Sequence, residues 1–446
     1  MKFKKFGRVT LALVVSLGLG FGITSCSTDF TAAFLYVTGT QYNQIGAFQV
    51  LNNTGNLRVV NGSPYGSGGT NPIRSLVSST GRYLYVLNNG SPSADSSGNI
   101  TYSGENISIF SIGGGGNLAF QQSYTSQGTG SIRMGFNSTG SYLYVLDEYM
   151  PQKNAAGQIV NASSSQSTAF PCPDPSAPGI WRPVGAITAF SVDTNTGRLS
   201  LITNNQQTDS SGAQLTTFPV GCFPIDIKVS AGFIFVPDNG PAPGSNNTLF
   251  QSVFVYALNA TNGQLTLTQN SELPTGAKQI STIGSDQANK YIYILDTGDN
   301  QIFYYTIGTS GLLQAVTGSP TPNVPASAVN PVALTSDSKG KFLYIANAGP
   351  SSGTTNPNSQ ITAYTIQANG VLAPIASPNP ITTGSGPQCI IEDPSNQYIY
   401  TADSISNTVT GHVLDPNSGL LTDLRNATSY ATVGTPTWCV ASGHTD

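Results

Sequence analysis

A short aromatic strand motif occurs seven times along the chain, and this repeat limits the possible folds more than any other feature of the sequence. Each copy resembles Tyr83-Leu84-Tyr85-Val86, and a second apolar strand follows it. The copies begin at Phe34, Tyr83, Tyr142, Phe233, Tyr291, Phe342 and Tyr398. After each second strand comes a turn in which Gly precedes Leu by two residues, at Gly55, Gly116, Gly197, Gly263, Gly311, Gly370 and Gly419. Short strands and turns at such regular spacing predict an all-β fold.

A fourth strand precedes each aromatic strand, and its first residue is usually Pro. These first residues are Pro72, Ser131, Pro224, Ile280, Pro331, Pro387 and Pro436. Pro is tolerated at the first residue of a strand because that residue need not donate to the ladder. Four antiparallel strands in each of seven repeats predict a seven-bladed β-propeller with the Pro-led strand innermost. A solenoid would have atypical end repeats, whereas the first and last copies here are ordinary.

The two ends of the repeat array predict how the ring closes. The array opens on an aromatic strand at Phe34 and ends on a Pro-led strand over residues 436–441. The C-terminal strand must therefore complete the first blade as its innermost strand, which also hides two strand edges.

The N-terminal segment predicts export from the cytoplasm. Residues 1–25 combine four basic residues with an apolar run, as signal peptides do. The sequence Ile23-Thr24-Ser25-Cys26 resembles the lipobox of bacterial lipoproteins, so we expect Cys26 to be lipidated and residues 26–32 to form a tether. Ser27 favours the outer membrane, and the lipid would be the protein's sole membrane contact. The alternative is an ordinary signal peptide with an incidental Cys.

Charge limits the partners that the propeller, residues 33–446, can bind. Lys, Arg, Asp and Glu make up 9% of the chain, well below the usual proportion of about 25%. Without residues 1–25 the chain keeps 13 of its 17 basic residues and all 21 acidic residues, a net charge of −8. A nucleic-acid interface needs a basic stripe, and the sequence has none, so we expect no nucleic-acid partner. We also expect a monomer.

Four cysteines remain after Cys26, and export favours their oxidation. Four cysteines allow three pairings. We predict a Cys172–Cys222 disulfide, because both residues belong to the same face of a propeller; the alternative is two unpaired thiols. The partners of Cys389 and Cys439 stay open. No pair has CxxC spacing, so we expect no zinc site and no other metal or cofactor.

Long connections between strands suggest where a site could lie. They span residues 90–105, 148–185, 204–221, 240–251 and 349–359. In antiparallel four-stranded blades these connections emerge on one face, and binding residues concentrate on such loops. The sequence therefore predicts a site at that mouth of the central channel. We expect the acidic residues that end the aromatic strands to surround it and to contact substrate: Asp147, Asp238, Asp296 and Asp403.

Basic residues of the innermost strands predict an anion site. Arg74 lies two residues after Pro72, and Arg133 lies two residues after Ser131, so the two occupy equivalent positions of their strands. Arg binds carboxylates in a bidentate manner, so we expect Arg74 and Asp226 among the substrate contacts. The alternative is that these charges solvate a water-filled channel or brace neighbouring blades.

The chain resembles the lactonase family of seven-bladed propellers, which includes bacterial 6-phosphogluconolactonase and relatives of the muconate-lactonizing enzyme. The resemblance rests on residues 71–86, residues 330–345 and Thr196-Gly-Arg-Leu-Ser200, and it covers roughly residues 33–441. Propellers with YVTN repeats are the nearest rival, but their repeat lacks the Gly-x-Leu strand. The resemblance implies hydrolysis of a lactone, with Glu148 and Arg133 as catalytic residues.

One feature departs from that family. Lactonases carry a His-containing segment in an inner strand of a middle blade, whereas residues 222–229 contain no His. The chain has two His, and His412 stands where other repeats have an aromatic residue, so we expect it to pack in the core. Two hypotheses follow. One is an envelope lactonase acting on a sugar-acid lactone, and the other is a non-catalytic propeller that binds glycans or proteins through its long loops.

Overall fold

The computed structural model describes residues 29–94, 100–150, 172–173, 181–209, 211–240, 251–268, 273–350, 359–376 and 379–443. The chain divides into two units, Met1–Phe30 and Thr31–Asp446, and all strands belong to the second unit. The predicted signal peptide and Cys26 lie outside the described residues. None of the described residues belongs to a helix that is long and apolar enough to cross a membrane.

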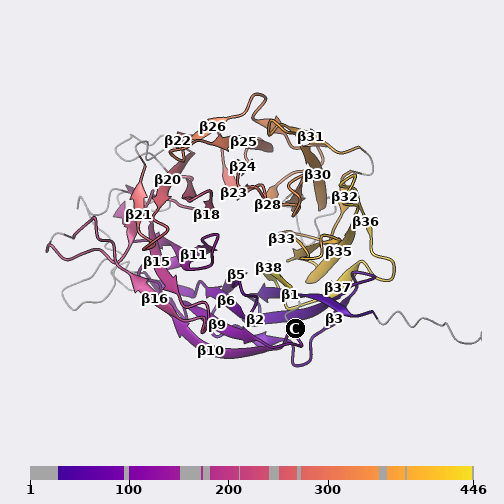
Figure 1. The fold of residues 1–446 in the computed structure, drawn as a ribbon, viewed down its shortest axis with the longest axis horizontal. Helices are drawn as coiled ribbons and strands as arrows, with labels where there is room; N and C mark the ends of the chain where they lie inside the picture. The colour runs from indigo at the N-terminus through magenta and orange to yellow at the C-terminus, as the bar shows by residue number, and fades with distance from the viewer. Residues whose placement is uncertain are drawn as a thin grey trace, which may run out of the picture. The chain divides into compact units, whose positions relative to one another are not determined.

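Seven antiparallel sheets surround a central axis in the second unit, which is a seven-bladed β-propeller (Figure 1). From the axis outward, blade 1 consists of β38 (Pro436–Gly443), β1 (Thr31–Gly39), β2 (Gln44–Leu51) and β3 (Leu57–Val59), and blade 2 of β5 (Pro72–Val77), β6 (Tyr83–Asn88), β9 (Asn106–Ile112) and β10 (Leu118–Tyr124). Blade 3 consists of β11 (Thr129–Phe136), β12 (Tyr142–Tyr149), β15 (Ala186–Val192) and β16 (Leu199–Ile202), and blade 4 of β18 (Lys228–Ser230), β19 (Phe233–Asp238), β20 (Ser252–Leu258) and β21 (Leu265–Leu267). The all-β fold and the predicted strand order are confirmed.

Blades 5 to 7 repeat this order with β23 (Ile280–Ser285), β24 (Tyr291–Asp296), β25 (Gln301–Ile307) and β26 (Leu313–Ala315); β28 (Pro331–Ser336), β29 (Phe342–Asn347), β30 (Gln360–Ile366) and β31 (Leu372–Pro374); and β33 (Pro387–Glu392), β34 (Tyr398–Asp403), β35 (Thr408–Leu414) and β36 (Leu421–Asp423). Six blades have a short fifth strand that the sequence did not predict: β4 (Tyr65–Gly66), β17 (Phe218–Pro219), β22 (Leu273–Pro274), β27 (Thr321–Pro322), β32 (Ile381–Thr382) and β37 (Ser429–Ala431). Two hairpins complete the described strands: β7 (Ser91–Ala94) with β8 (Ile100–Ser103), and β13 (Cys172–Pro173) with β14 (Trp181–Arg182).

The C-terminal strand closes the ring as predicted. Strand β38 pairs antiparallel with β1, from Ala33 opposite Gly443 to Gly39 opposite Pro436. Because these strands come from the two ends of the propeller sequence, their backbone hydrogen bonds tie the first blade to the last part of the chain. The structure also contains two disulfides, Cys172–Cys222 and Cys389–Cys439. The second joins innermost strands of blades 7 and 1, next to the closure.

The repeated aromatic and Gly residues form one contact between neighbouring blades. In five blades the second aromatic is a Tyr that donates its hydroxyl to the carbonyl oxygen of the turn Gly in the next blade, as Tyr36 does to Gly116 at 3.0 Å. Blade 4 has Phe235 at this position, and the Tyr293 hydroxyl of blade 5 has no partner among the described residues. The first aromatic of each blade packs against the same turn Gly, as Phe34 does on Gly116. The motif therefore recurs because it attaches each blade to its neighbour.

We expect Gly116→Ala to lower the free energy of unfolding by about 2 kcal/mol, because two costs combine. Gly116 has a φ of +82°, and an added Cβ would meet the ring of Phe34. Gly114→Ala is the matched control, since nothing lies within 4 Å of a Cβ there. Chemical denaturation of both variants measures the difference. Equal stabilities would contradict this account of the turn.

Candidate functional site

A bulge near the start of the innermost strands brings seven side chains to equivalent positions around the central channel. In blade 2, Pro72 pairs with Asn88 but Arg74 already pairs with Leu87, so one residue is extra. Five other blades have the same shift, and in blade 4 Pro224 bridges Asp238 two residues before Asp226. We call the resulting set the channel layer, and in blade order it consists of Trp438, Arg74, Arg133, Asp226, Thr282, Ala333 and Cys389.

Asp226 is the centre of the polar contacts in the channel layer. It is fully buried, and its Oδ1 lies 3.6 Å from Nη2 of Arg74 and 3.5 Å from Nε of Arg133. Thr282 donates its hydroxyl to Oδ2 at 2.6 Å, and the amide of Ile283 donates to the same oxygen at 3.3 Å. The amide of the residue after Asp226 donates to Oδ1. One carboxylate thus serves two guanidinium groups, which leaves this region with net positive charge.

Arg74 is held in place but keeps unused donors. Its guanidinium lies over the Trp438 ring, 3.3 Å from the ring centroid, and its side chain is 12% exposed. The Nε atoms of Arg74 and Arg133 are buried without hydrogen-bond partners. Burial lowers the pKa of Arg74 to about 9, although Asp226 opposes the change. The guanidinium is therefore predominantly charged at neutral pH, and an anion could satisfy its free N–H groups.

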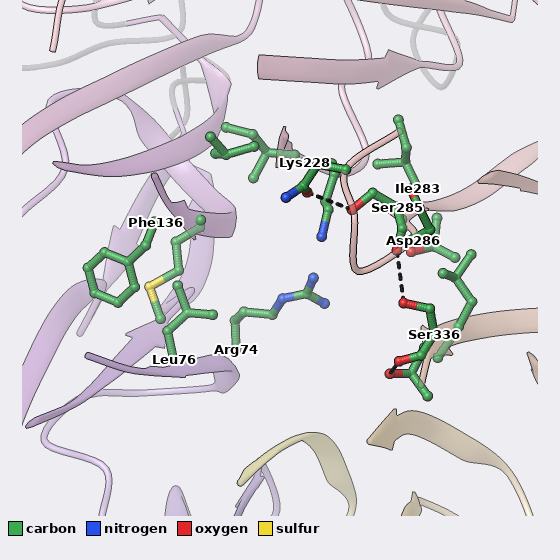
Figure 2. Close-up of a pocket in the computed structure, with 18 of the residues that line it drawn as sticks. Arg74, Leu76, Phe136, Lys228, Ile283, Ser285, Asp286 and Ser336 are labelled. Atoms are coloured by element: carbon green, nitrogen blue, oxygen red, sulfur yellow. Dashed lines mark hydrogen bonds between the residues drawn. The ribbon is translucent and has the colours of Figure 1, made fainter. Parts of the chain in front are cut away.

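A cavity of about 430 Å³ begins at the channel layer and extends to one face of the propeller (Figure 2). We call this the turn face, because it carries the turns that join innermost to second strands, such as residues 286–290. The cavity wall includes Arg74, Thr282 and Trp438 of the layer and polar residues of the turn face, among them Ser285, Asn289 and Ser336. Gly135, Gly284 and Ala333 also line it, and their small size leaves room for the cavity. The volume lies within the range of small-molecule sites, about 300–1,000 Å³.

Lys228 extends into this cavity from β18, and its amine and the Arg74 guanidinium point into the same space (Figure 2). Burial lowers the pKa of Lys228, Asp226 and Asp286 oppose the change, and Arg74 adds to it. Within the described chain, no carboxylate lies close enough to form an ion pair with its amine. Lys228 was missed in the sequence, because nothing in the repeat marks its position as facing a cavity.

The acidic residues that end the aromatic strands are hydrogen-bonded within their own blades. Asp147 accepts from Ser126, Ser131 and Thr188, and Asp403 accepts from Thr410. Asp238 and Asp296 accept hydrogen bonds from backbone amides. All four are buried, and none lines the cavity. Burial raises the pKa of Asp147 and of Asp403 to about 6. Their contact with substrate stays a prediction. In the structure their hydrogen bonds hold the ends of the aromatic strands in place.

Glu148 and Arg133, the predicted catalytic pair, lie in neighbouring strands but are not shown in contact. Glu148 accepts a hydrogen bond from the Tyr102 hydroxyl at 3.2 Å, whereas Arg133 is paired with Asp226. Glu105, which the sequence did not single out, lies nearby and accepts from the amide of Ser131. Burial raises the pKa of Glu105 to about 7. These carboxylates belong to the face that carries the long connections, opposite the turn face.

The sequence placed the site at the mouth with the long loops, while the described cavity lies between the channel layer and the turn face. Loop length does not report where the channel is wide, because the side chains of the innermost strands decide that. Residues 151–171, 241–250 and 351–358, which form most of three predicted loops, lie outside the described residues. Aligning the innermost strands by their first residue would have placed Asp226, Thr282 and Trp438 beside Arg74 and Arg133.

Comparison with known proteins agrees with this architecture. Residues 314–441 match the family model described as lactonase, 7-bladed beta-propeller. A periplasmic gluconolactonase from Pseudomonas aeruginosa has a similar structure, with 15% identity, a TM-score of 0.64, and coverage of 93% of this chain and 100% of that one. Proteins provisionally named 6-phosphogluconolactonases are similar too. The protein from Bacteroides uniformis has 14% identity and a TM-score of 0.63, and the match covers 92% of this chain and 100% of that one. The protein from Bacteroides fragilis has 15% identity and a TM-score of 0.62, and the match covers 93% of this chain and 99% of that one.

The search of curated protein sequences found no match. The structural similarities, at 14–15% identity, support the fold, and the family model covers the last blades. The chain is therefore a seven-bladed β-propeller that resembles the 6-phosphogluconolactonases, and its residues 314–441 match the lactonase family.

Proposed function

We propose that this propeller binds a sugar-acid lactone in the channel cavity and opens it by hydrolysis. The observation that carries the proposal is a cavity lined by Arg74, whose Nε has no hydrogen-bond partner among the described residues and which shares the buried Asp226 with Arg133 behind the cavity wall. A site with this charge favours a carboxylate or phosphate, and the hydroxyl and amide groups of Ser285, Ser336 and Asn289 suit a polyol.

Arg74 would stabilise the charge that develops during ring opening. When water adds to a lactone carbonyl, the carbonyl oxygen becomes negative, and preorganised donors lower the energy of that state. Asp226 holds Arg74 by an ion pair, and Trp438 holds it by stacking, so its guanidinium needs little reorganisation. Asp226 itself is a poor base, because amides, a hydroxyl and two guanidinium groups already occupy its oxygens.

Arg74→Ala should lower kcat/KM for lactone hydrolysis about 100-fold, the size of effect that loss of one oxyanion donor has elsewhere. A panel of δ- and γ-lactones of sugar acids, with and without phosphate, is assayed by proton release. Arg82→Ala is the control, since Arg82 is exposed in a turn outside the cavity. The non-catalytic alternative would be favoured by two results together: the unaltered protein hydrolyses no lactone, and it binds glycans or proteins only when the long loops are present.

We further propose that the protein is a lipoprotein of the bacterial envelope. The lipobox-like sequence before Cys26 and two disulfides in the propeller support this location. Cys26→Ser should move the protein from the membrane fraction to the soluble periplasmic fraction on cell fractionation. Unchanged membrane association of that variant would reject lipidation at Cys26.

A further inference from the structure

Three charged or titratable side chains line the described cavity, and two of them are unsuited to accept a proton. They are Arg74, Lys228 and Asp286. A guanidinium is too weak an acid to lose its proton at neutral pH, even with the lowered pKa of Arg74. Asp286 is buried, and its Oδ1 accepts the amides of Lys290 and Tyr291 at 2.7 Å, so this carboxylate stabilises the turn. Lys228 is left as the group whose proton can move.

The surroundings of Lys228 favour a neutral amine. Arg74 and Lys228 point into one space (Figure 2). Arg133, from the neighbouring blade, adds a second guanidinium close to Asp226. Asp226 is the nearest opposing carboxylate in sequence, but its oxygens are already shared by two guanidinium groups and three further donors. Asp286 faces the cavity from the turn that follows β23, and its Oδ1 accepts the backbone amides of Lys290 and Tyr291. Burial lowers the pKa of the Lys228 amine, in the direction that a base at neutral pH requires.

We propose that the neutral amine of Lys228 is the general base of lactone opening, a role for which this site has no His. This inference rests on the proposed function. The amine takes a proton from water while the water oxygen bonds to the lactone carbonyl carbon, and the carbonyl oxygen becomes an oxyanion beside Arg74. The ring C–O bond then breaks, and its oxygen receives the proton from the Lys228 ammonium. The new carboxylic acid loses its own proton to solvent, which leaves an open hydroxy-carboxylate.

Lys228→Arg and Lys228→Met separate a base from a mere positive charge. Arg carries a positive charge at every working pH and cannot accept a proton, so both variants should lose about 100-fold in kcat, while Lys228→Arg keeps KM within about threefold. In the unaltered protein kcat should fall at low pH as the amine becomes protonated, and this acid limb should be absent from the residual activity of Lys228→Arg. Lys339→Met is the control, because Lys339 is exposed in the turn between β28 and β29.

A second measurement follows the amine directly. Trace acetylation with acetic anhydride at a series of pH values, read by peptide mass spectrometry, should give Lys228 a lower midpoint than Lys339. Circular dichroism of the variants checks that each is folded. Suppose that the unaltered protein is active and that Lys228→Arg has the same kcat and the same fall of kcat at low pH. That result would overturn the role of Lys228 but not the proposed function. Equal acetylation midpoints for Lys228 and Lys339 would do the same. An unaltered protein that opens no lactone would overturn the proposed function and this step together.

Discussion

Replacing both Cys389 and Cys439 with Ala should lower the free energy of unfolding by about 4 kcal/mol. The disulfide joins residues 50 positions apart, and closing a loop of that length restricts the unfolded chain by this amount in the chain-entropy model. Both residues are buried in a cluster that includes Leu35 and Tyr400, and Ala avoids placing a hydroxyl there. Chemical denaturation under non-reducing conditions measures the change.

The Cys172/Cys222 pair offers a matched control for this prediction. Its residues are also 50 positions apart, so loop length alone predicts the same cost when both become Ala. The Cys389–Cys439 disulfide additionally bridges the innermost strands of blades 7 and 1, beside the pairing of β38 with β1. We therefore expect its loss to be the more damaging of the two. A cost below about 1 kcal/mol would show that β38 closes the ring without help from the disulfide.

His412→Phe should stabilise the protein, and the gain should grow as the pH falls. His412 is fully buried in β35, neither ring nitrogen has a hydrogen-bond partner, and the exposed Asp423 lies 3.6 Å from Nδ1. Burial lowers the pKa of His412 from 6.5 to about 4. Between these values the unfolded chain binds a proton that the folded protein does not, so stability is lost as the pH falls through this range. The loss amounts to about 3 kcal/mol between pH 7 and pH 4, and Phe removes it.

The comparison must use the difference between the variant and the unaltered protein at each pH. Burial raises the pKa of Glu392 to about 7, so its protonated form contributes stability that is present below about pH 4.5 and lost as the pH rises through 7. That effect has the opposite sign to the effect of His412 and is common to both proteins. Denaturation curves at pH 7.5, 6, 5 and 4 give the difference. A gain that does not change with pH would contradict the assigned burial of a neutral imidazole.

The repeat determined the number of blades, the strand order and the ring closure. The first aromatic of each of the seven strands packs against the turn Gly of the next blade, as Phe34 does on Gly116, so one local sequence pattern corresponds to one tertiary contact. Because that contact is repeated, it could be recognised without the structure. The burial of His412 could be predicted for the same reason, because His412 occupies a position at which the other repeats have an aromatic residue.

The site itself depended on the tertiary structure. Arg74 and Arg133 were visible as equivalent residues, but their shared partner Asp226 and the stacking of Arg74 on Trp438 join strands far apart in the chain. The cavity lies on the turn face because Gly135, Gly284 and Ala333 leave space there, and the residues at these strand positions differ from blade to blade. Repeated local contacts can be read from a sequence, whereas the shape and charge of a channel depend on side chains that the repeat leaves free to vary.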